Sequence, residues 1–261
     1  MLKKTAFQHE NGIALIVVLW MLVVMTAIAF AFSQQVRTEI MLTANYQNQA
    51  KASSLAEAGI WRGVAMVLNR TVAENNGENI NMAGSVYELD SELGKLNVSL
   101  QSISGLIDLN RASPEIIKAL LQTVDTPFET QQTILDSLLD WRDEDDLKRV
   151  SGAEDDDYRD QGLSYGPSNG LMNSVSELAR VNGVTSLEYE ALQSSVTVYS
   201  GQSRIDITSA PARVLSSLPA MDSSMTESII NERATGNKHI DLTQIPAETR
   251  KYIGAGQNEF I

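Results

Sequence analysis

The most constraining feature of this sequence is an uninterrupted apolar run close to its beginning. Residues 13–32 carry no charge, and a helix of that length rises about 30 Å, which matches the hydrocarbon core of a bilayer. A secretory signal peptide has a shorter apolar region, of about 7 to 15 residues, followed by a cleavage site of small residues. Here the run continues into Ser33-Gln34-Gln35-Val36-Arg37 instead. We therefore expect a membrane helix that stays on the protein.

The flanks of the apolar run predict its orientation and how far the helix extends. Lys3 and Lys4 precede it, so the positive-inside rule places the N-terminus in the cytoplasm. The rest of the chain would then lie on the far side of the inner membrane, which is the periplasm of a two-membrane bacterium. The first proline of the chain is Pro114, which leaves nothing to stop the helix sterically. We expect a single helix over residues 13–68, half in lipid and half in water.

The composition argues against several classes of function. The chain has 33 acidic and 20 basic residues, a formal net charge of −13, so most of its surface would repel nucleic acid. It has no cysteine, which removes thiolate metal sites and cysteine nucleophiles. Its two histidines, His9 and His239, stand on opposite sides of the apolar run, which leaves little for histidine-based catalysis. We expect a protein that is not an enzyme and binds no nucleic acid.

The segment after the helix predicts a small antiparallel sheet. Residues 69–84 are polar and rich in turn formers. Two strand patterns follow at 85–89 and 95–101, and residues 90–94 between them fit a hairpin connection. A long helix followed by antiparallel strands is an α+β arrangement, with the helix packed on one face of the sheet. A later strand pattern at 196–199 is expected to rejoin this sheet.

An internal repeat follows the predicted sheet. Residues 107–120 (IDLNRASPEIIKAL) align with residues 205–218 (IDITSAPARVLSSL), 98 positions later. Each copy predicts a short extended piece that leads into a helix, with a serine near the N-cap and a proline at the first turn. A second helical pattern follows each copy, at 134–142 and 227–233. We expect two helical modules of a globular structure.

The repeat also raises an alternative function. An Ile-Asp-Leu-Asn-x-Ala-Ser-Pro segment before a helix resembles the start of a helix-hairpin-helix unit, as found in membrane-anchored DNA receptors. Such a unit binds phosphate through a glycine-rich hairpin at a helix N-terminus. Residues 123–127 and 219–223 take that place here, and they bring Asp125 and Asp222 in place of glycine. The repeats are therefore better interpreted as packing modules.

Three sequence features together resemble a known family. They are the short basic leader that ends in Gly12, the apolar IALIVVLW that begins at Ile13, and the LAEAG of residues 55–59. They resemble type IV pilin-like proteins and, more narrowly, the K-type minor pseudopilins of the type II (general) secretion pathway. The resemblance implies that a prepilin peptidase cuts between Gly12 and Ile13 and methylates the new amino group of Ile13. From the residues alone, a plain membrane anchor remains open.

One position distinguishes this chain from most pilins. Counted from Ile13, the fifth residue is Val17, where most pilins carry a glutamate that meets the amino group of a neighbouring subunit. A carboxylate in lipid is costly and is therefore usually paired. K-type members also lack this glutamate, so the resemblance implies that Val17 marks a subunit at the tip of the fibre. The residue itself leaves open that valine is simply a better membrane residue.

The densest charge lies between Asp136 and Asp160. This stretch holds eleven carboxylates against four basic side chains. Calcium prefers about six to eight oxygen ligands in an adaptable cage, but composition alone favours a solvated acidic loop. K-type pseudopilins bind calcium in a loop of similar sequence, so the resemblance implies one or two calcium ions. The expected ligands are Asp140, Asp143, Asp145, Glu154, Asp155 and Asp156.

The resemblance also implies a domain organisation, a pilin-like α+β fold with a mostly helical domain inserted in the sheet region. Its parts are a prepilin leader, the transmembrane part of the helix, a first pilin-like part, the helical insertion with the acidic loop, and a second pilin-like part. The expected boundaries are 1–12, 13–32, 33–105, 106–195 and 196–261. Family members generally continue beyond the point where this sequence stops, so we expect a naturally short or a truncated chain.

The function that the resemblance implies is structural. A K-type pseudopilin caps the pseudopilus of the type II secretion system and nucleates its assembly in the inner membrane. Its implied partners are the I-type and J-type minor pseudopilins, the major pseudopilin and the prepilin peptidase. The fibre then helps to export folded proteins across the outer membrane. A minor pilin of a type IV pilus is the nearest alternative.

Overall fold

The computed structural model describes residues 10–70, 72, 80–92, 94–235 and 240–254. Its contacts divide the chain into two compact units, Met1–Trp61 with Asp90–Leu96 and Arg62–Leu89 with Asn97–Ile261. Several features of the sequence fall wholly or largely outside the described residues. These are the leader lysines, the polar segment after the long helix, His239 and the C-terminal end.

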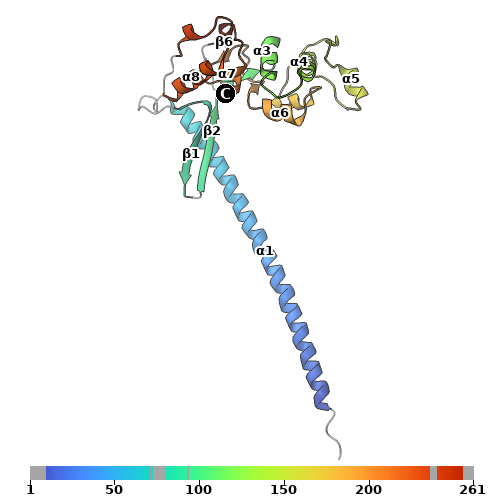
Figure 1. The fold of residues 1–261 in the computed structure, drawn as a ribbon. Helices are drawn as coiled ribbons and strands as arrows, with labels where there is room; N and C mark the ends of the chain where they lie inside the picture. Colours follow the sequence, from blue (N-terminus) through green and yellow to red (C-terminus); the bar gives the residue numbers. More distant parts are fainter. Residues whose placement is uncertain (1–9, 71, 73–79, 93, 236–239, 255–261) are drawn as a thin grey trace, which may run out of the picture. The chain divides into compact units, whose positions relative to one another are not determined.

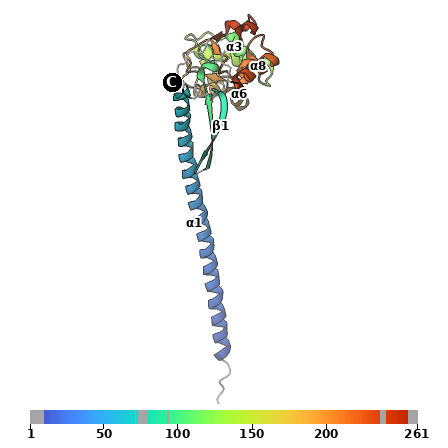
Figure 2. The same cartoon turned by 90° about the vertical axis from the view of Figure 1, so that its left-hand side faces the viewer.

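Helix α1, Glu10–Leu68, is the longest described element and confirms the expected long helix. Figures 1 and 2 show it as one continuous helix. Its apolar half exposes large hydrophobic side chains, for example Leu15 (70% exposed) and Trp20 (66% exposed). Such a surface is costly in water and suited to lipid. Within the described part of the chain, α1 alone is long and apolar enough to cross a membrane.

Strands β1, Ala83–Ser91, and β2, Gly94–Gln101, form the expected antiparallel hairpin. Covered and exposed side chains alternate along β1, as in a sheet with one face in solvent. On β2, Val98 is buried, and a Cβ atom on Gly63 of α1 would lie 3.3 Å from the Cγ1 atom of Val98. A glycine at this position therefore lets the end of the helix approach the strand closely.

The internal repeat folds as two modules of the same pattern, as expected. Each module begins with a two-residue strand, which leads into a short helix and then into a longer one. The first module contains β3 (Ile107–Asp108), α3 (Pro114–Leu121) and α4 (Phe128–Arg142). The second contains β5 (Ile205–Asp206), α7 (Ala212–Ser217) and α8 (Ser223–Ala234).

An arginine at the end of the longer helix ties each module together. Arg142 donates to the backbone oxygen of Ala112 at 3.0 Å, and Arg233 donates to the backbone oxygen of Ala210 at 2.6 Å. The two alanines occupy equivalent positions of the repeat. Hydrogen bonds from a charged donor are stronger than neutral ones, so the same device fixes the second helix against the first turn of both modules. The repeat therefore extends beyond the segments that align in sequence.

A short parallel ladder closes each module. β4, Val196–Thr197, pairs with β3, and β6, Ile253–Gly254, pairs with β5. Residues 196–199 were expected to rejoin the β1–β2 sheet, and this expectation is wrong, because among the described strands β4 pairs with β3 alone. A strand of two residues is held by its neighbour and by burial, so its local pattern does not reveal its partner. The expected boundaries at 106 and 195 stay predictions.

The aspartate that opens each module has a structural role. The buried carboxylate of Asp108 accepts hydrogen bonds from the backbone N–H of Asn110 at 2.9 Å and from the hydroxyl of Ser200 at 2.9 Å. In the second module, Asp206 accepts from the backbone N–H of Thr208 at 2.9 Å. An aspartate that bonds the backbone two residues ahead stabilises a turn. The repeated aspartates thus serve the fold of each module.

The remaining described elements are short. They are η1 (Ile103–Gly105), α5 (Asp155–Asp160), η2 (Val175–Arg180), α6 (Ser186–Leu192), η3 (Leu242–Gln244) and η4 (Thr249–Lys251). Buried aliphatic side chains from both modules form one core beneath them. Examples are Ile107, Ile116 and Leu138 from the first module and Ile205, Val214 and Leu215 from the second. This core carries the acidic segment on its surface.

Candidate functional site

The acidic loop (residues 143–154) connects α4 to α5, and both of its ends are anchored in the core. Trp141, in the last turn of α4, and Tyr158, in α5, are buried and meet edge-on with ring centroids 5.9 Å apart. The Tyr158 hydroxyl accepts a hydrogen bond from the backbone N–H of Asn182 at 2.9 Å. Burial raises the pKa of Tyr158 to about 12. A rigid aromatic pair therefore fixes the distance between the two ends of the loop.

A single arginine joins the carboxylates at the start of the acidic loop. Nη1 of Arg149 lies 2.5 Å from Oδ1 of Asp140 and 2.5 Å from Oδ2 of Asp143. The backbone N–H of Arg149 also donates to Oδ2 of Asp140 at 3.2 Å. Asp140 is fully buried. Burial lowers the pKa of Arg149, but the hydrogen bonds to Asp143 and Asp140 and the charges of these two residues outweigh that effect, so the pKa of Arg149 is raised. The loop thus folds back on α4 around an ion pair in which Asp140 is buried and Arg149 is partly exposed.

The glycine of the Gly-Ala-Glu-Asp segment is required by this arrangement. A Cβ atom on Gly152 would lie 1.8 Å from Oδ2 of Asp140, which is closer than a Cβ atom can approach an oxygen atom. Glycine therefore lets the backbone pass directly over the carboxylate of Asp140. Gly152 therefore has a steric role in the fold of the acidic loop.

Glu154 is the buried carboxylate at the far end of the acidic loop. Its side chain is 7% exposed, and neither of its oxygen atoms has a hydrogen-bond partner among the described residues. Burial and the charges of four nearby aspartates, led by Asp140 and Asp143, together raise the pKa of Glu154 to about 7. A buried carboxylate without a partner is unfavourable, so Glu154 has a strong tendency to bind a proton or a cation.

Two further oxygen atoms in the same neighbourhood resemble those of Glu154. Oδ1 of Asp143 and Oδ1 of Asn169 are buried and lack a partner within the described part of the chain. Asn169 adopts a left-handed backbone with φ of 45°, and its Nδ2 donates to Asp146 at 2.9 Å. Asp146 is one of the aspartates whose charge acts on Glu154. The sequence prediction missed Asn169, because it lies fifteen residues beyond Glu154 in a stretch of turn formers.

The other expected ligands have different surroundings. Asp145 is exposed and accepts from the backbone N–H of Leu147 at 2.9 Å. Asp155 is exposed and lies against Gly166, where a Cβ atom would fall 1.9 Å from its Oδ1. Asp156 is exposed and pairs with Arg159. The structure therefore joins Asp140 and Asp143 through Arg149 and leaves both within electrostatic range of Glu154, whereas Asp156 pairs with Arg159.

The donor set of the acidic loop fits a hard divalent cation, although a closed cage is not formed. Within the residues that the structure describes, no three acidic or histidine side chains are already gathered as a metal-binding group. The buried, unpartnered atoms nearby are carboxylate and amide oxygens of Asp143, Glu154 and Asn169. These are the ligands that calcium accepts in flexible geometry, whereas zinc favours nitrogen and sulfur. The chemistry of these donors therefore suits calcium.

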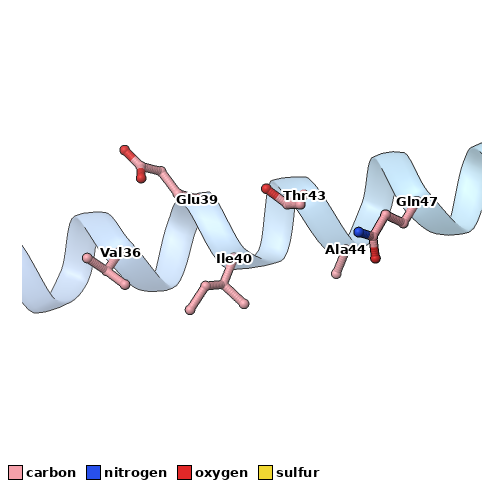
Figure 3. A pocket seen from close by; sticks show the side chains of 6 residues that line it. All are labelled: Val36, Glu39, Ile40, Thr43, Ala44 and Gln47. Atoms are coloured by element: carbon pink, nitrogen blue, oxygen red, sulfur yellow. The ribbon is translucent and has the colours of Figure 1, made fainter.

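The expected cleavage and tip positions lie on α1. Gly12 and Ile13 are in the first turn of the helix, and Ile13 and Val17 are exposed along its apolar half. Further along, Figure 3 shows the side chains of Val36, Ile40 and Ala44 on one side of α1. These side chains form an apolar stripe at helical spacing beyond the membrane-length run. The residues around it come from a single helix, so they form an open surface rather than a cavity.

Comparisons with known proteins show what the chain is similar to. A family model described as type II secretion system (T2SS), protein K, matches residues 94–201. The chain is 28% identical over 244 residues to the type II secretion system protein K of Pseudomonas aeruginosa, covering 86% of this chain and 72% of that protein. It is 25% identical over 205 residues to the protein of the same name from Pectobacterium carotovorum, covering 70% of this chain and 61% of that protein.

A solved structure supports the fold. The chain resembles a chain of the crystal structure of the GspK-GspI-GspJ complex from the enterotoxigenic Escherichia coli type 2 secretion system, with a TM-score of 0.50 and 17% identity. The match covers 78% of this chain and 82% of that chain. The match includes most of the chain and shows a similar fold. The family model and the curated relatives together show that this chain is similar to type II secretion system protein K.

Proposed function

We propose that the protein is the minor pseudopilin at the tip of the type II secretion pseudopilus. In this role it nucleates assembly of the fibre and helps to export folded proteins across the outer membrane. The observation that carries the proposal is α1, a 59-residue helix whose exposed apolar beginning continues directly into a polar half. A helix of this kind places one end in lipid and leaves the other available for packing in a fibre. The role is that of a structural component.

The position of the chain in the membrane follows from the same helix. The family and the single apolar helix of the described residues fit a protein anchored in the inner membrane. We propose that the N-terminus lies in the cytoplasm before cleavage and that the modules lie in the periplasm. A prepilin peptidase would cut between Gly12 and Ile13 and methylate Ile13, which leaves the apolar run on the mature protein.

Mass spectrometry of the N-terminus tests this proposal. The full chain is expressed with its secretion system, extracted from membranes in detergent and digested, and the N-terminal peptide is sequenced. We expect a chain that begins at N-methylated Ile13. A Gly12→Val variant is expected to keep its leader, because a β-branched side chain blocks close approach of the peptidase to the backbone. An intact Met1 on the wild-type protein would contradict the proposal and favour a plain anchor.

The proposed partners are the I-type and J-type minor pseudopilins, followed by the major pseudopilin. Support comes from the fold, which resembles a chain solved in a complex named GspK-GspI-GspJ. A tip subunit has no neighbour above it, so the carboxylate that other pilins use to meet that neighbour is not needed. Val17 of this chain agrees with such a position. Co-purification of the three minor pseudopilins from detergent-extracted membranes tests the partnership.

We also propose that the acidic loop binds calcium. Asp143, Glu154 and Asn169 would supply the inward oxygen atoms, with Asp140 beside them. When bound, the ion would neutralise a cluster of carboxylates that repel one another. Asp145, Asp155 and Asp156 stay candidates for a second ion or for solvent-facing positions. Calorimetric titration of the EGTA-stripped full chain in detergent with calcium chloride tests the proposal, and the absence of both binding heat and a rise in melting temperature would contradict it.

A further inference from the structure

We propose that Arg149 is a built-in counter-cation, which holds Asp140 and Asp143 in the calcium-free protein and competes with calcium for them. The inference rests on the calcium site proposed above. It concerns regulation of that site, because it makes calcium binding an exchange of one cation for another instead of a simple addition. The ion would have to displace the guanidinium group before it could use both aspartates.

The geometry of Arg149 supports an exchange. One nitrogen atom, Nη1, lies 2.5 Å from a carboxylate oxygen of both Asp140 and Asp143. These two oxygens are the hard donors that a divalent cation would also use. The arginine side chain remains 39% exposed, while the carboxylate of Asp140 is 0% exposed. The guanidinium group therefore has a route into solvent, whereas the carboxylate of Asp140 is fixed in place.

Glu154 offers a place for a second cation next to the carboxylates that Arg149 holds. Glu154 is more than nine-tenths buried, and both of its oxygens lack a partner among the described residues. Its charge interacts with those of Asp140 and Asp143, so these carboxylates share one neighbourhood. A divalent ion beside Glu154 would repel the positive charge on Arg149, since two charges at contact distance in a poorly solvated site interact strongly. Arg149 therefore has to move away, or it weakens binding.

The neighbouring basic residues do not share this role. Lys148 pairs with Asp157 in α5, and Arg142 donates to the backbone oxygens of Leu109 and Ala112. Arg142 thus serves the first module, and Lys148 pairs with a carboxylate that is not one of the expected ligands. Lys148 offers a matched control, because it lies next to Arg149 and carries the same charge.

Titration of matched variants tests the inference. The full chain, as wild type, Arg149→Gln and Lys148→Gln, is stripped with EGTA in detergent and titrated with calcium chloride by calorimetry. We expect Arg149→Gln to lower the dissociation constant roughly tenfold or more, because an opposing charge is removed from contact distance. Its melting temperature should fall in EGTA, where the carboxylates lose their counter-charge, and approach the wild-type value in saturating calcium. Lys148→Gln should change the dissociation constant much less.

The outcomes separate the inference from the proposal beneath it. Calcium binding by wild type, with equal or weaker binding by Arg149→Gln, would overturn the inference and leave the calcium site standing. Binding by Arg149→Gln alone would support competition by Arg149 but would contradict the calcium site proposed for the wild-type protein. No binding by either protein would overturn both.

A second measurement covers the case in which the variant fails to fold. In wild-type protein labelled with ¹⁵N-arginine, we expect one guanidinium resonance to be protected from solvent exchange in EGTA and to lose that protection when calcium is added. The Arg149→Lys variant assigns the resonance. A guanidinium that stays protected in saturating calcium would contradict displacement.

Discussion

At the scale of single residues, the carboxylates in and next to the acidic loop are only partly neutralised by basic side chains. Arg149 compensates two of its carboxylates, whereas Glu154 is buried and has no hydrogen-bond partner within the described residues. Burial and four surrounding aspartates raise the pKa of Glu154 to about 7. In the calcium-free protein this residue therefore opposes folding whenever it is ionised, and with calcium bound it would supply a strong ligand. The same side chain is costly in one state and useful in the other.

Replacing Glu154 should separate these two effects. Glu154→Gln removes the charge but keeps the size, so we expect the calcium-free protein to become more stable above about pH 7, where the ionised carboxylate opposes folding. The rise in melting temperature on adding calcium should be lost. Asp160→Asn is the control, because Asp160 is exposed at the end of α5 and is not one of the expected ligands. Unchanged calcium-dependent stabilisation in Glu154→Gln would argue against Glu154 as a ligand.

The residues of this site were only partly predictable from the sequence. The run of aspartates indicated where charge gathers, and it included Asp140, Asp143 and Glu154. It did not distinguish buried from exposed carboxylates, because burial depends on the Trp141–Tyr158 contact and on the passage of Gly152 over Asp140. Asn169 carries no charge and lies outside the run. Its placement beside Asp146 arises from tertiary structure alone.

At the scale of elements, the two modules are joined as well as repeated. Gly105, in η1 before the first module, lies against the backbone of the second. A Cβ atom on Gly105 would fall 2.4 Å from both the carbonyl carbon and oxygen of Ser209 and 2.6 Å from the backbone nitrogen of Ala210. The amide of Gln101 also donates to the oxygen of Ser209 at 3.0 Å. The end of the hairpin is thus packed onto the loop that precedes α7.

A substitution at Gly105 should disrupt this contact. Gly105→Ala forces its methyl group against backbone atoms that cannot rotate away, and we expect a loss of about 1–3 kcal/mol, as for other overpacked positions. Gly170→Ala is the matched control, because its added Cβ atom would lie 3.7 Å from the nearest atom, the oxygen of Ser168. Chemical unfolding of the two variants in detergent compares them directly. Equal stability of both variants would show that the two backbones do not meet as described.

Element type was easier to predict than element pairing. The repeat predicted a strand followed by two helices in both copies, because the apolar periodicity and the proline at each first turn are local signals. The partners of β3 and β5 were not predicted. β4 and β6 have two residues each, and a pair of apolar residues gives no information on which strand it will join. The arginines that bond Ala112 and Ala210 were likewise not predicted, because α4 and α8 follow the two aligned segments at different distances.

At the scale of the whole molecule, the single helix α1 has one part suited to lipid and one part suited to water. Its first part exposes apolar side chains suited to lipid, and from Ser33 onward polar residues appear between apolar ones. A continuous helix transmits position along its length, because each residue is fixed relative to the next by backbone hydrogen bonds. The depth of the apolar part of α1 in the membrane would therefore determine how far the polar part projects from the membrane surface. Residues near the beginning of α1 consequently bear on assembly as well as on anchoring.

Val17 provides the test of this connection. In Val17→Glu, a carboxylate enters the membrane part of α1, where an unpaired charge costs up to about 2.5–3.5 kcal/mol at the centre and less near the interface. A tip subunit has no neighbour to pair with it, so we expect leader cleavage to continue while pseudopilus formation and export of a secreted protein fall several-fold. Val17→Ala is the control and should behave as wild type, because it changes size without adding charge. If Val17→Glu supports export as well as Val17→Ala does, the carboxylate has found a partner, and the chain occupies a position below the tip.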